Sequence, residues 1–367
     1  MKYLMVNNPT HSLLGLVVLL FATPAWAQLQ FPANDWETVA PESVGWDKEG
    51  LDQALDFAFT RNSSEVIIVL RGKILAQRRQ NIQNKSTRYR NRIEGQDDRG
   101  QDIEDVASAQ KSIVSFLVGV AQEKKLISID DPVHKHLGEG WSKASGEREA
   151  KIKVRHLITM TSGLNTRLQF VAPAGTQWKY NTTAYARSLQ VIEQAAGMTA
   201  NQLTKKWLTD PIGMKDSKWV KRPGGGLLSA VDANTVGFAT TASDLARFGL
   251  LMLADGKWKA NVLLADKQYL KDSHSPSQQL NPSYGYLWWL NGKKAAVRPI
   301  GGKTNKPLLA EAPADMYAAQ GAMGRKCYVC PSLDLVVVRL GDTPDSFGKT
   351  RFDKQFWKLI MQAAPRK

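Results

Sequence analysis

Apolar and polar residues follow a helical period near the start of the chain and a strand period soon after it. Asp47 to Phe59 has apolar residues three and four positions apart after an acidic start, which predicts a helix. Glu65 to Gln77 contains two β-rich runs joined at Arg71-Gly72-Lys73 and predicts a hairpin. Arg78 to Gly100 is polar and mixed in charge, which predicts a surface loop. Ser108 to Gln122 is apolar on nearly every helical face, so we expect a helix buried on all sides.

The middle of the chain has a helical pattern with short loops. It runs from Leu126 to about Met214 and includes an amphipathic helix from Tyr185 to Ala196, which Gly197 ends. A Gly-rich stretch at Pro223 to Gly226 follows, and Thr241 to Ala254 is again helical.

The C-terminal third returns to strands. The predicted strands are Tyr286 to Leu290, Lys326 to Cys330 and Leu333 to Leu340, the last two joined by a turn at Pro331-Ser332, and Phe352 to Ala363 predicts a closing helix.

Strands near both ends with helices between them predict an α/β (α+β) fold. We expect an antiparallel sheet flanked by helices, built from residues 28–125 and 235–367, with an all-helical lobe inserted at residues 126–234. A cleft between the two parts is the natural place for a functional site.

The first residues are typical of a signal peptide. Lys2 precedes the apolar run Leu13 to Ala22, and Ala25-Trp26-Ala27 fits the small-x-small rule for cleavage. The run is shorter than a membrane span of about 20 residues. We therefore expect residues 1–27 to be removed after Ala27, leaving an exported, periplasmic or secreted protein with no stable membrane span. An uncleaved anchor is the alternative.

Composition excludes several classes of protein. With 43% hydrophobic residues the chain is not disordered, and two cysteines cannot form a disulfide framework. The net charge of +15 could indicate nucleic acid, but the basic clusters, such as Arg88 to Arg92 and Lys205-Lys206, are short and separate, so we expect no nucleic-acid partner. Cys327 and Cys330 stand three apart on a predicted strand and should point to opposite faces, as packing residues.

The histidines give little support for metal or triad chemistry. His134 and His136 form an H-x-H pair without further ligands at suitable spacing, and the chain lacks a G-x-S-x-G motif. We therefore expect no metal site and no cofactor.

A serine and a lysine one helical turn apart offer another nucleophile. Burial lowers the pKa of a lysine, so its neutral amine can accept a proton from the serine, whose backbone N–H at a helix start can donate to an oxyanion. Two S-x-x-K matches exist. Ser346 to Lys349 lies in a predicted surface turn, whereas Ser108-Ala109-Gln110-Lys111 opens the most apolar helix after the signal peptide. Ser108 is therefore the candidate nucleophile and Lys111 its base.

Tyr180 is a candidate third catalytic residue. It follows the turn-rich stretch Pro173 to Thr176 and precedes the helix at Tyr185. Beside a lysine ammonium its phenolate would be stabilised and could relay a proton. A buried tyrosine with a satisfied hydroxyl is the alternative.

Together with other motifs these residues resemble the serine β-lactamase and penicillin-binding-protein superfamily, in its class C-like branch of esterases, D-peptidases and 6-aminohexanoate-dimer hydrolases. The resemblance covers nearly the whole chain after residue 27. The motifs that carry it are Ser108 to Lys111, His156 to Leu164, Pro173 to Trp178 with Tyr180, Pro211 to Met214, and Gly237 to Ala242 with Asp244 to Ala246.

The resemblance implies further site residues and shows two departures. Thr182 stands where the tyrosine motif usually has Asn, and Ala319-Gln320-Gly321 stands where a third motif usually begins with Lys or His. Lys303-Thr304-Asn305 looks closer in letters but lacks the glycine and the adjoining hairpin. The family's oxyanion hole implies the backbone N–H groups of Ser108 and Ala322. Further candidates for substrate binding are Gln110, Thr182, Gln320, Gly321 and Trp288. Trp289 and Tyr286 are expected near the same cleft, with aromatic packing between the lobes as the alternative for all three aromatic residues.

The expected function is hydrolysis of a small-molecule or short-peptide ester or amide through an acyl-enzyme on Ser108. Because Ala319 cannot hold a substrate carboxylate, we rank an esterase or short-amide hydrolase above a β-lactamase or D-alanyl carboxypeptidase. The Thr182 and Ala319 departures keep a third alternative open, a catalytically inactive cell-envelope binding protein. The sequence indicates no oligomeric state.

Overall fold

The computed structural model describes residues 1, 29–83, 85–222, 235–344 and 351–365. The predicted signal peptide after Met1, the Gly-rich stretch and the second S-x-x-K match therefore lie outside the described residues. Within the described ranges, no helix combines the length and the apolar character that crossing a membrane requires.

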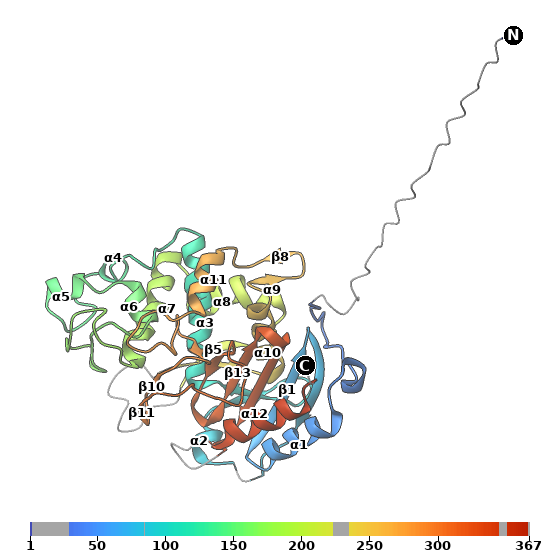
Figure 1. The fold of residues 1–367 in the computed structure, drawn as a ribbon. Helices are drawn as coiled ribbons and strands as arrows, with labels where there is room; N and C mark the ends of the chain where they lie inside the picture. The colour runs from blue at the N-terminus through green and yellow to red at the C-terminus, as the bar shows by residue number, and fades with distance from the viewer. Residues whose placement is uncertain (2–28, 84, 223–234, 345–350, 366–367) are drawn as a thin grey trace.

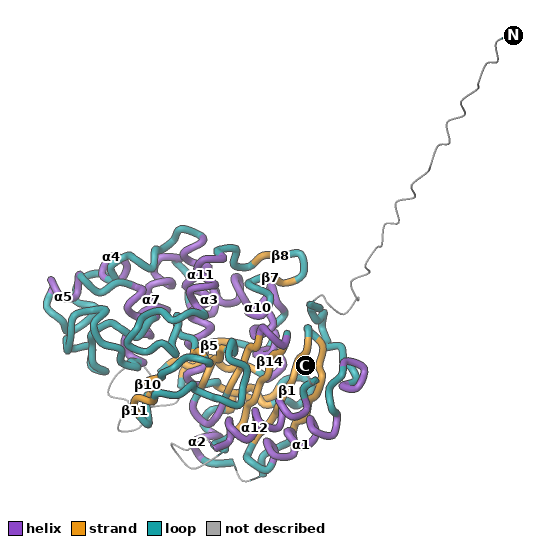
Figure 2. The backbone as a smooth tube through the Cα atoms, viewed as in Figure 1, coloured by secondary structure: helices purple, strands orange, loops and turns teal. Residues whose placement is uncertain are grey.

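A six-stranded antiparallel sheet organises the larger part of the molecule (Figures 1 and 2). Its strands, in spatial order, are β2 (Lys73–Arg79), β1 (Ser63–Leu70), β14 (Leu335–Gly341), β13 (Lys326–Cys330), β12 (Tyr317–Gln320) and β9 (Trp289–Leu290). The predicted N-terminal hairpin is β1–β2, and β1 pairs with β14 from Ser63↔Gly341 to Leu70↔Leu335. The two ends of the chain thus build one sheet, as the strand pattern predicted.

Alternate residues of β1 enter two different cores. Val66 and Ile68 pack in the layer of α1 (Lys48–Phe59) and α12 (Arg351–Ala363), which lie side by side in Figure 1. Ile67 and Val69 pack on the opposite face, which α10 (Ala242–Leu253) covers. All four side chains are fully buried. This strict alternation is what period-2 side-chain geometry requires of a strand with helices on both faces.

Helix α3 (Gln110–Glu123) is buried along nearly its whole length, as its all-round apolar pattern predicted. It packs against α7 (Thr182–Ala196) and α11 (Lys267–Ser273), between the sheet and the helical part of the molecule. A short 3-10 turn, η2 (Ala107–Ala109), precedes it and carries Ser108. The nucleophile candidate therefore stands in the turn that leads into the helix, and Lys111 stands in the first helical turn.

The helical part gathers away from the sheet (Figure 2). Asn181 caps α7 by accepting hydrogen bonds from the N–H groups of Thr183 and Ala184, and Gly197 ends it in the left-handed region. The other members are α4 (His134–Leu137), α5 (Gly146–Ala150), α6 (Val154–Ile158), α8 (Ala200–Thr204), the π-helical turn η3 (Lys205–Thr209) and α9 (Asp210–Ile212).

A smaller four-stranded sheet adjoins this region, in the order β3 (Ile93–Gln96), β4 (Asp102–Asp105), β6 (Val236–Thr240) and β5 (Lys218–Lys221). Strand β5 lies inside the range predicted for the helical lobe and pairs with β6. The remaining elements are η1 (Pro41–Val44), the pairs β7 (Lys257–Trp258) with β8 (Asn261–Val262) and β10 (Ala296–Arg298) with β11 (Gly302–Thr304), and the turns η5 (Ala322–Gly324) and η6 (Pro331–Leu333).

Two local predictions were wrong. The supposed surface loop Arg78–Gly100 contains the end of β2, the helix α2 (Thr87–Arg90) and β3, because Tyr89 is fully buried and its hydroxyl donates to Glu104 Oε1 at 2.8 Å. The strand expected at Tyr286–Leu290 is confined to Trp289–Leu290, since Leu287 has a φ of 61° and cannot continue an extended chain.

Candidate active site

The structure places the predicted nucleophile and base in contact. A hydrogen bond of 3.1 Å joins Lys111 Nζ to Ser108 Oγ, as one helical turn of separation predicted. Ala107, just before the serine, has a φ of 52°, in the left-handed region, and its N–H donates to Asp105 Oδ1 at 2.8 Å. A non-glycine residue in this region costs about 1 kcal/mol or more and needs surrounding structure to hold it. The carboxylate of Asp105 is part of that structure.

Lys111 is suited to act as a base. Its side chain is 2% exposed, and this burial, together with the nearby charge of Arg222, holds the pKa of the amine well below its usual value. Its Nζ lies 4.9 Å from the ring centroid of Tyr180 and 4.3 Å from that of Tyr185. The lowered pKa favours the neutral amine, which can accept the proton of Ser108.

Tyr180 also reaches the nucleophile, but in a different protonation state from the one predicted. Its hydroxyl is hydrogen-bonded with Ser108, and its ring stacks on Trp289 with centroids 6.0 Å apart. Burial raises the pKa of Tyr180, so the predicted phenolate is wrong. The burial that lowers the pKa of Lys111 also disfavours the ammonium that a neighbouring phenolate would need. Tyr180 is a phenol that can donate a proton.

A cavity of about 490 Å³ opens over these residues. Ser108, Tyr180, Gln320, Gly321 and Ala322 all line it, so the structure brings these five predicted site residues together. A Cβ added at Gly321 would lie 2.2 Å from the carbonyl oxygen of Val106. Only glycine lets the end of β12 approach η2 this closely, which places Ala322 on the same cavity as Ser108.

Three predicted substrate-binding residues do not line the cavity. Gln110 is 3% exposed and its amide donates to Tyr185 Oη (2.7 Å) and accepts from the N–H of Phe238 (3.1 Å), so it is a structural residue and not part of the rim. Trp288 is fully buried and stacks on Phe248 in the core. Thr182 is the first residue of α7 and lies outside the cavity lining.

Trp289, expected at the cleft together with Trp288, does line the cavity, and it stacks on Tyr180. A charged residue of the lining, by contrast, was missed by the sequence interpretation. Lys326 also lines the cavity and donates to Gln320 Oε1 at 3.1 Å and to Asp353 Oδ2 at 2.8 Å. Lys326 is the register partner of Gln320 on β13. That register was readable from the hairpin pattern and could have identified Lys326.

The third motif lies on β12, as predicted from its position before the last hairpin. Ala319 is 1% exposed and faces the core, so it offers nothing to a substrate. Lys303, which resembles the third motif more closely in its residue types, lies on β11 and does not line the cavity. A cation nevertheless reaches the cavity from Lys326, which weakens the reason for ranking substrates with a carboxylate lower because of Ala319.

Asp105 is the centre of an ion-pair network next to the nucleophile, and it holds the residue that precedes Ser108. Asp105 is 1% exposed and accepts from Arg92 Nη1 and Arg222 Nε, both at 2.6 Å, besides the N–H of Ala107. These cations keep the pKa of Asp105 below its usual value despite its burial. Asp105 is therefore a carboxylate that fixes both a strained residue and two arginines.

Asp105→Asn should lower the free energy of unfolding at pH 7 by about 3–5 kcal/mol, because it removes the charge of a buried carboxylate that accepts from two arginines and from the N–H of Ala107. Because folding lowers the pKa of Asp105, its carboxylate contributes to the stability of the folded state above pH 3.8, and this contribution is lost as the pH falls through the folded-state pKa. The difference in the free energy of unfolding between wild type and Asp105→Asn should therefore become smaller in acid. Urea unfolding measures both effects.

Asp130→Asn is the matched control, because Asp130 also pairs with two basic residues but its side chain is 52% exposed. It should cost less than about 1 kcal/mol. Equal losses for the two variants would contradict the role assigned to Asp105.

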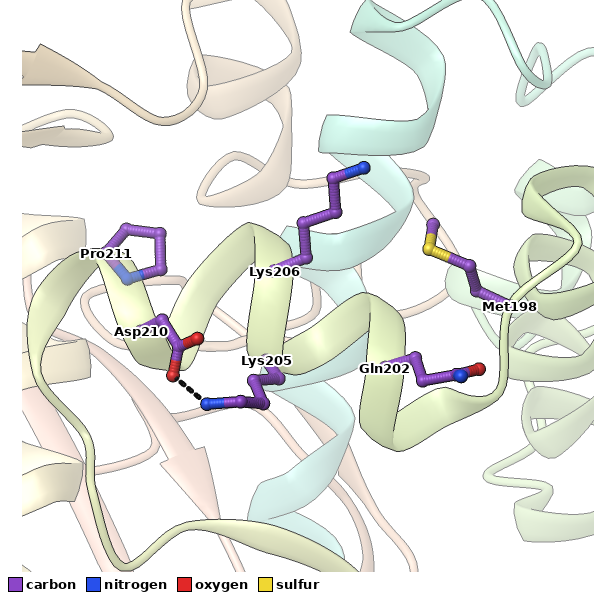
Figure 3. Close-up of a pocket in the computed structure, with 6 residues that line it drawn as sticks. All are labelled: Met198, Gln202, Lys205, Lys206, Asp210 and Pro211. Carbon is purple, nitrogen blue, oxygen red and sulfur yellow. Dashed lines mark hydrogen bonds and ion pairs between the residues drawn. The ribbon is translucent and has the colours of Figure 1, made fainter.

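A larger hollow of about 720 Å³ lies elsewhere, along η3 (Figure 3). It shares no lining residue with the Ser108 cavity, and an ion pair of 2.5 Å joins two of its charged residues, Lys205 and Asp210. It is an open surface between exposed side chains and has no nucleophile in its lining.

The cysteines and histidines behave as structural residues. Cys327 and Cys330 are free, buried and divided between the two cores on opposite faces of the sheet, as predicted. His136 pairs with Asp131 at 2.9 Å. In the described ranges, His, Cys, Asp and Glu form no group of three that could hold a metal ion.

A family model described as Beta-lactamase matches residues 67–361. The chain belongs to the beta-lactamase family. This confirms the resemblance that the motifs indicated, and the family supports a serine hydrolase.

Solved structures of beta-lactamase-like proteins share the fold. A candidate β-lactamase of Bacteroides dorei is 16% identical with a TM-score of 0.64, covering 87% of this chain and 99% of that one. A candidate 6-aminohexanoate-dimer hydrolase of Bacillus anthracis is 15% identical with a TM-score of 0.61, covering 91% and 87%. A class C β-lactamase is 16% identical with a TM-score of 0.60, covering 87% and 97%. At these identities the likeness shows the fold alone.

Proposed function

We propose that this chain is an exported serine hydrolase that cleaves an ester or a short amide through an acyl-enzyme on Ser108. The observation that carries the proposal is the 3.1 Å contact between Ser108 Oγ and the buried Lys111 amine with its lowered pKa. Both the contact and the neutral amine are requirements for activating a serine without a histidine.

The residues have separate roles in the proposed reaction. Lys111 accepts the hydroxyl proton as Ser108 Oγ bonds to the carbonyl carbon, and the backbone N–H groups of Ser108 and Ala322 hold the resulting oxyanion. Tyr180 donates a proton to the leaving alcohol or amine as its bond to the carbonyl carbon breaks, and regains one from the attacking water. The attack of that water breaks the bond between the acyl carbon and Ser108 Oγ and releases the acid, and Lys111 returns its proton to Ser108 Oγ.

A β-lactamase or D-alanyl carboxypeptidase is the second candidate. Lys326 in the cavity favours it, because its amine, although paired with Asp353, stands beside Gln320 where the carboxylate of a β-lactam or of a peptide end could bind. The buried Ala319 favours the esterase or short-amide hydrolase, since the cation is displaced from the expected strand position. An inactive binding protein would have no use for a neutral lysine against a serine.

A fluorophosphonate probe tests the proposal by mass. We expect one adduct on purified full-length protein, mapped to the peptide that contains Ser108, and the same intact mass would show whether the chain begins at Gln28. Ser346→Ala, in the other S-x-x-K match, should label like wild type. A folded protein that takes no label would favour the inactive binding protein. A stable or turned-over penicillin adduct would favour the second candidate.

A further inference from the structure

The charged groups lining the Ser108 cavity do not balance. Its lining includes the cations Arg88, Arg298 and Lys326 and, in the described part of the chain, a single carboxylate, Asp353. Asp353 accepts from Lys326 Nζ at 2.8 Å and from the hydroxyl of Tyr328 at 2.8 Å. One cation is therefore neutralised, and the two arginines leave a net charge of about +2 facing the space where a substrate must sit.

Arg298 is held in place by a neutral carbonyl group. It ends β10, it is partly buried, and its Nη2 donates to the carbonyl oxygen of Leu308 at 2.5 Å. Among the described residues its guanidinium makes no contact ion pair, and the carboxylate on which its charge acts, Asp353, is already in contact with Lys326. Because the group that it contacts directly is a neutral carbonyl, its other N–H donors remain available to a ligand.

Apolar side chains surround the two arginines. Leu308, Leu309 and Met316 line the cavity beside Arg298, and Ile300, in the turn between β10 and β11, is 54% exposed. An exposed large aliphatic side chain at a cavity mouth indicates a ligand with an apolar portion.

We propose that Arg298, with Arg88 adding charge at the rim, forms an anion subsite, so that the preferred substrate carries a carboxylate joined by a short apolar chain to the bond that Ser108 attacks. This inference rests on the proposed function and specifies its substrate class. A guanidinium with free parallel donors matches a carboxylate in shape as well as charge. The anion is recognised from the β10–β11 hairpin and α2, and not from the strand position of Ala319.

Matched pairs of esters test the subsite. One set compares 4-nitrophenyl monoesters of succinic, glutaric and adipic acids with neutral 4-nitrophenyl esters of the same chain length, and another compares 4-acetoxybenzoate with its methyl ester. We expect kcat/KM to be about tenfold higher for the anionic member of at least one pair, mainly through a lower KM, and to decline with added salt.

Arg298→Gln should bring that ratio close to one, and Arg298→Lys should keep part of it, because charge remains while the fork geometry is lost. A merely structural role of the bond to Leu308 would make the two variants alike. Lys303→Gln is the matched control, since it removes a cation from the same hairpin outside the cavity lining and should leave the ratio unchanged. Equal rates for both members of every pair in wild type, or an unchanged ratio in Arg298→Gln, would overturn the subsite.

Failure of the proposed function can be separated from failure of the subsite. If no ester is turned over, 4-nitrophenyl glutarate can be titrated calorimetrically into Ser108→Ala and into the Ser108→Ala/Arg298→Gln double variant. Binding that Arg298→Gln weakens by about tenfold supports the subsite in a protein that is not a hydrolase. Absence of binding, or binding that is the same in both, overturns it. Esters that are hydrolysed without regard to charge leave the hydrolase intact and remove only the subsite.

Discussion

Ser108→Ala is expected to lower kcat/KM by at least about 10⁴-fold for any ester that the wild-type protein hydrolyses, because removing a nucleophile eliminates the covalent route entirely. Ser108 is only partly buried and stands in a 3-10 turn, so the loss of one hydroxyl should leave the fold intact. Steady-state hydrolysis of a 4-nitrophenyl ester, with the fluorophosphonate label measured on the same preparations, checks the result.

Ser112→Ala is the control from the same helix. Ser112 is 1% exposed and its hydroxyl donates to the carbonyl oxygen of Leu287 at 2.9 Å, so its loss should cost about 1 kcal/mol of stability and little activity. Residual hydrolysis above one part in 10³ in Ser108→Ala, free of contaminating enzyme, would mean that another group is the nucleophile.

The Ser–Lys contact could be predicted because it is local. Two residues three positions apart on an apolar helix must lie on one face, and burial on every side lowers the pKa of the lysine whatever surrounds it. The sheet built from both ends could be predicted for a similar reason, since Val66 to Val69 alternate between two cores and can only be a strand covered on both faces. Periodicity alone determines these features.

The remainder of the site depends on contacts between distant segments. Gln110 was predicted at the rim because it lies inside the motif, but helix rotation turns its amide toward Tyr185 and Phe238. Arg298 enters the cavity from a hairpin of three-residue strands, too short to show a period. The burial of Tyr89, on α2, depends on Glu104, fifteen residues away on β4. No local pattern specifies which of these polar groups meet.

The protonation states of Lys111 and Tyr180 also depend on contacts between distant segments and could not be predicted from local patterns. The sequence predicted a neutral lysine and a tyrosine phenolate together, yet a phenolate needs the ammonium that burial removes. In the structure burial favours the uncharged form of both groups, because it lowers the pKa of Lys111 and raises that of Tyr180. The catalytic pair is thus a neutral amine that can take a proton and a phenol that can give one.

Lys111→Met should therefore lower kcat/KM by about 10²–10⁴-fold, the usual contribution of a positioned general base. In wild type, activity should fall as the pH drops through the lowered pKa of Lys111, because protonation removes the base. The variant should lack this acid limb. A pH profile of kcat/KM for a neutral ester, measured on both proteins, separates loss of the base from general damage to the site.

The free energy of unfolding gives an independent check, because Lys111→Met should lower activity but raise stability. A buried lysine whose folded-state pKa lies below 10.5 binds fewer protons in the folded than in the unfolded protein, so wild-type stability should rise with pH up to about that value. Lys111→Met removes this dependence and should raise the free energy of unfolding at pH 7, since methionine fills the space without a proton to lose. Lys124→Met, at the exposed end of the same helix, should change neither activity nor stability. A Lys111→Met protein that is less stable but retains the acid limb would show that the lysine is structural and that another group is the base.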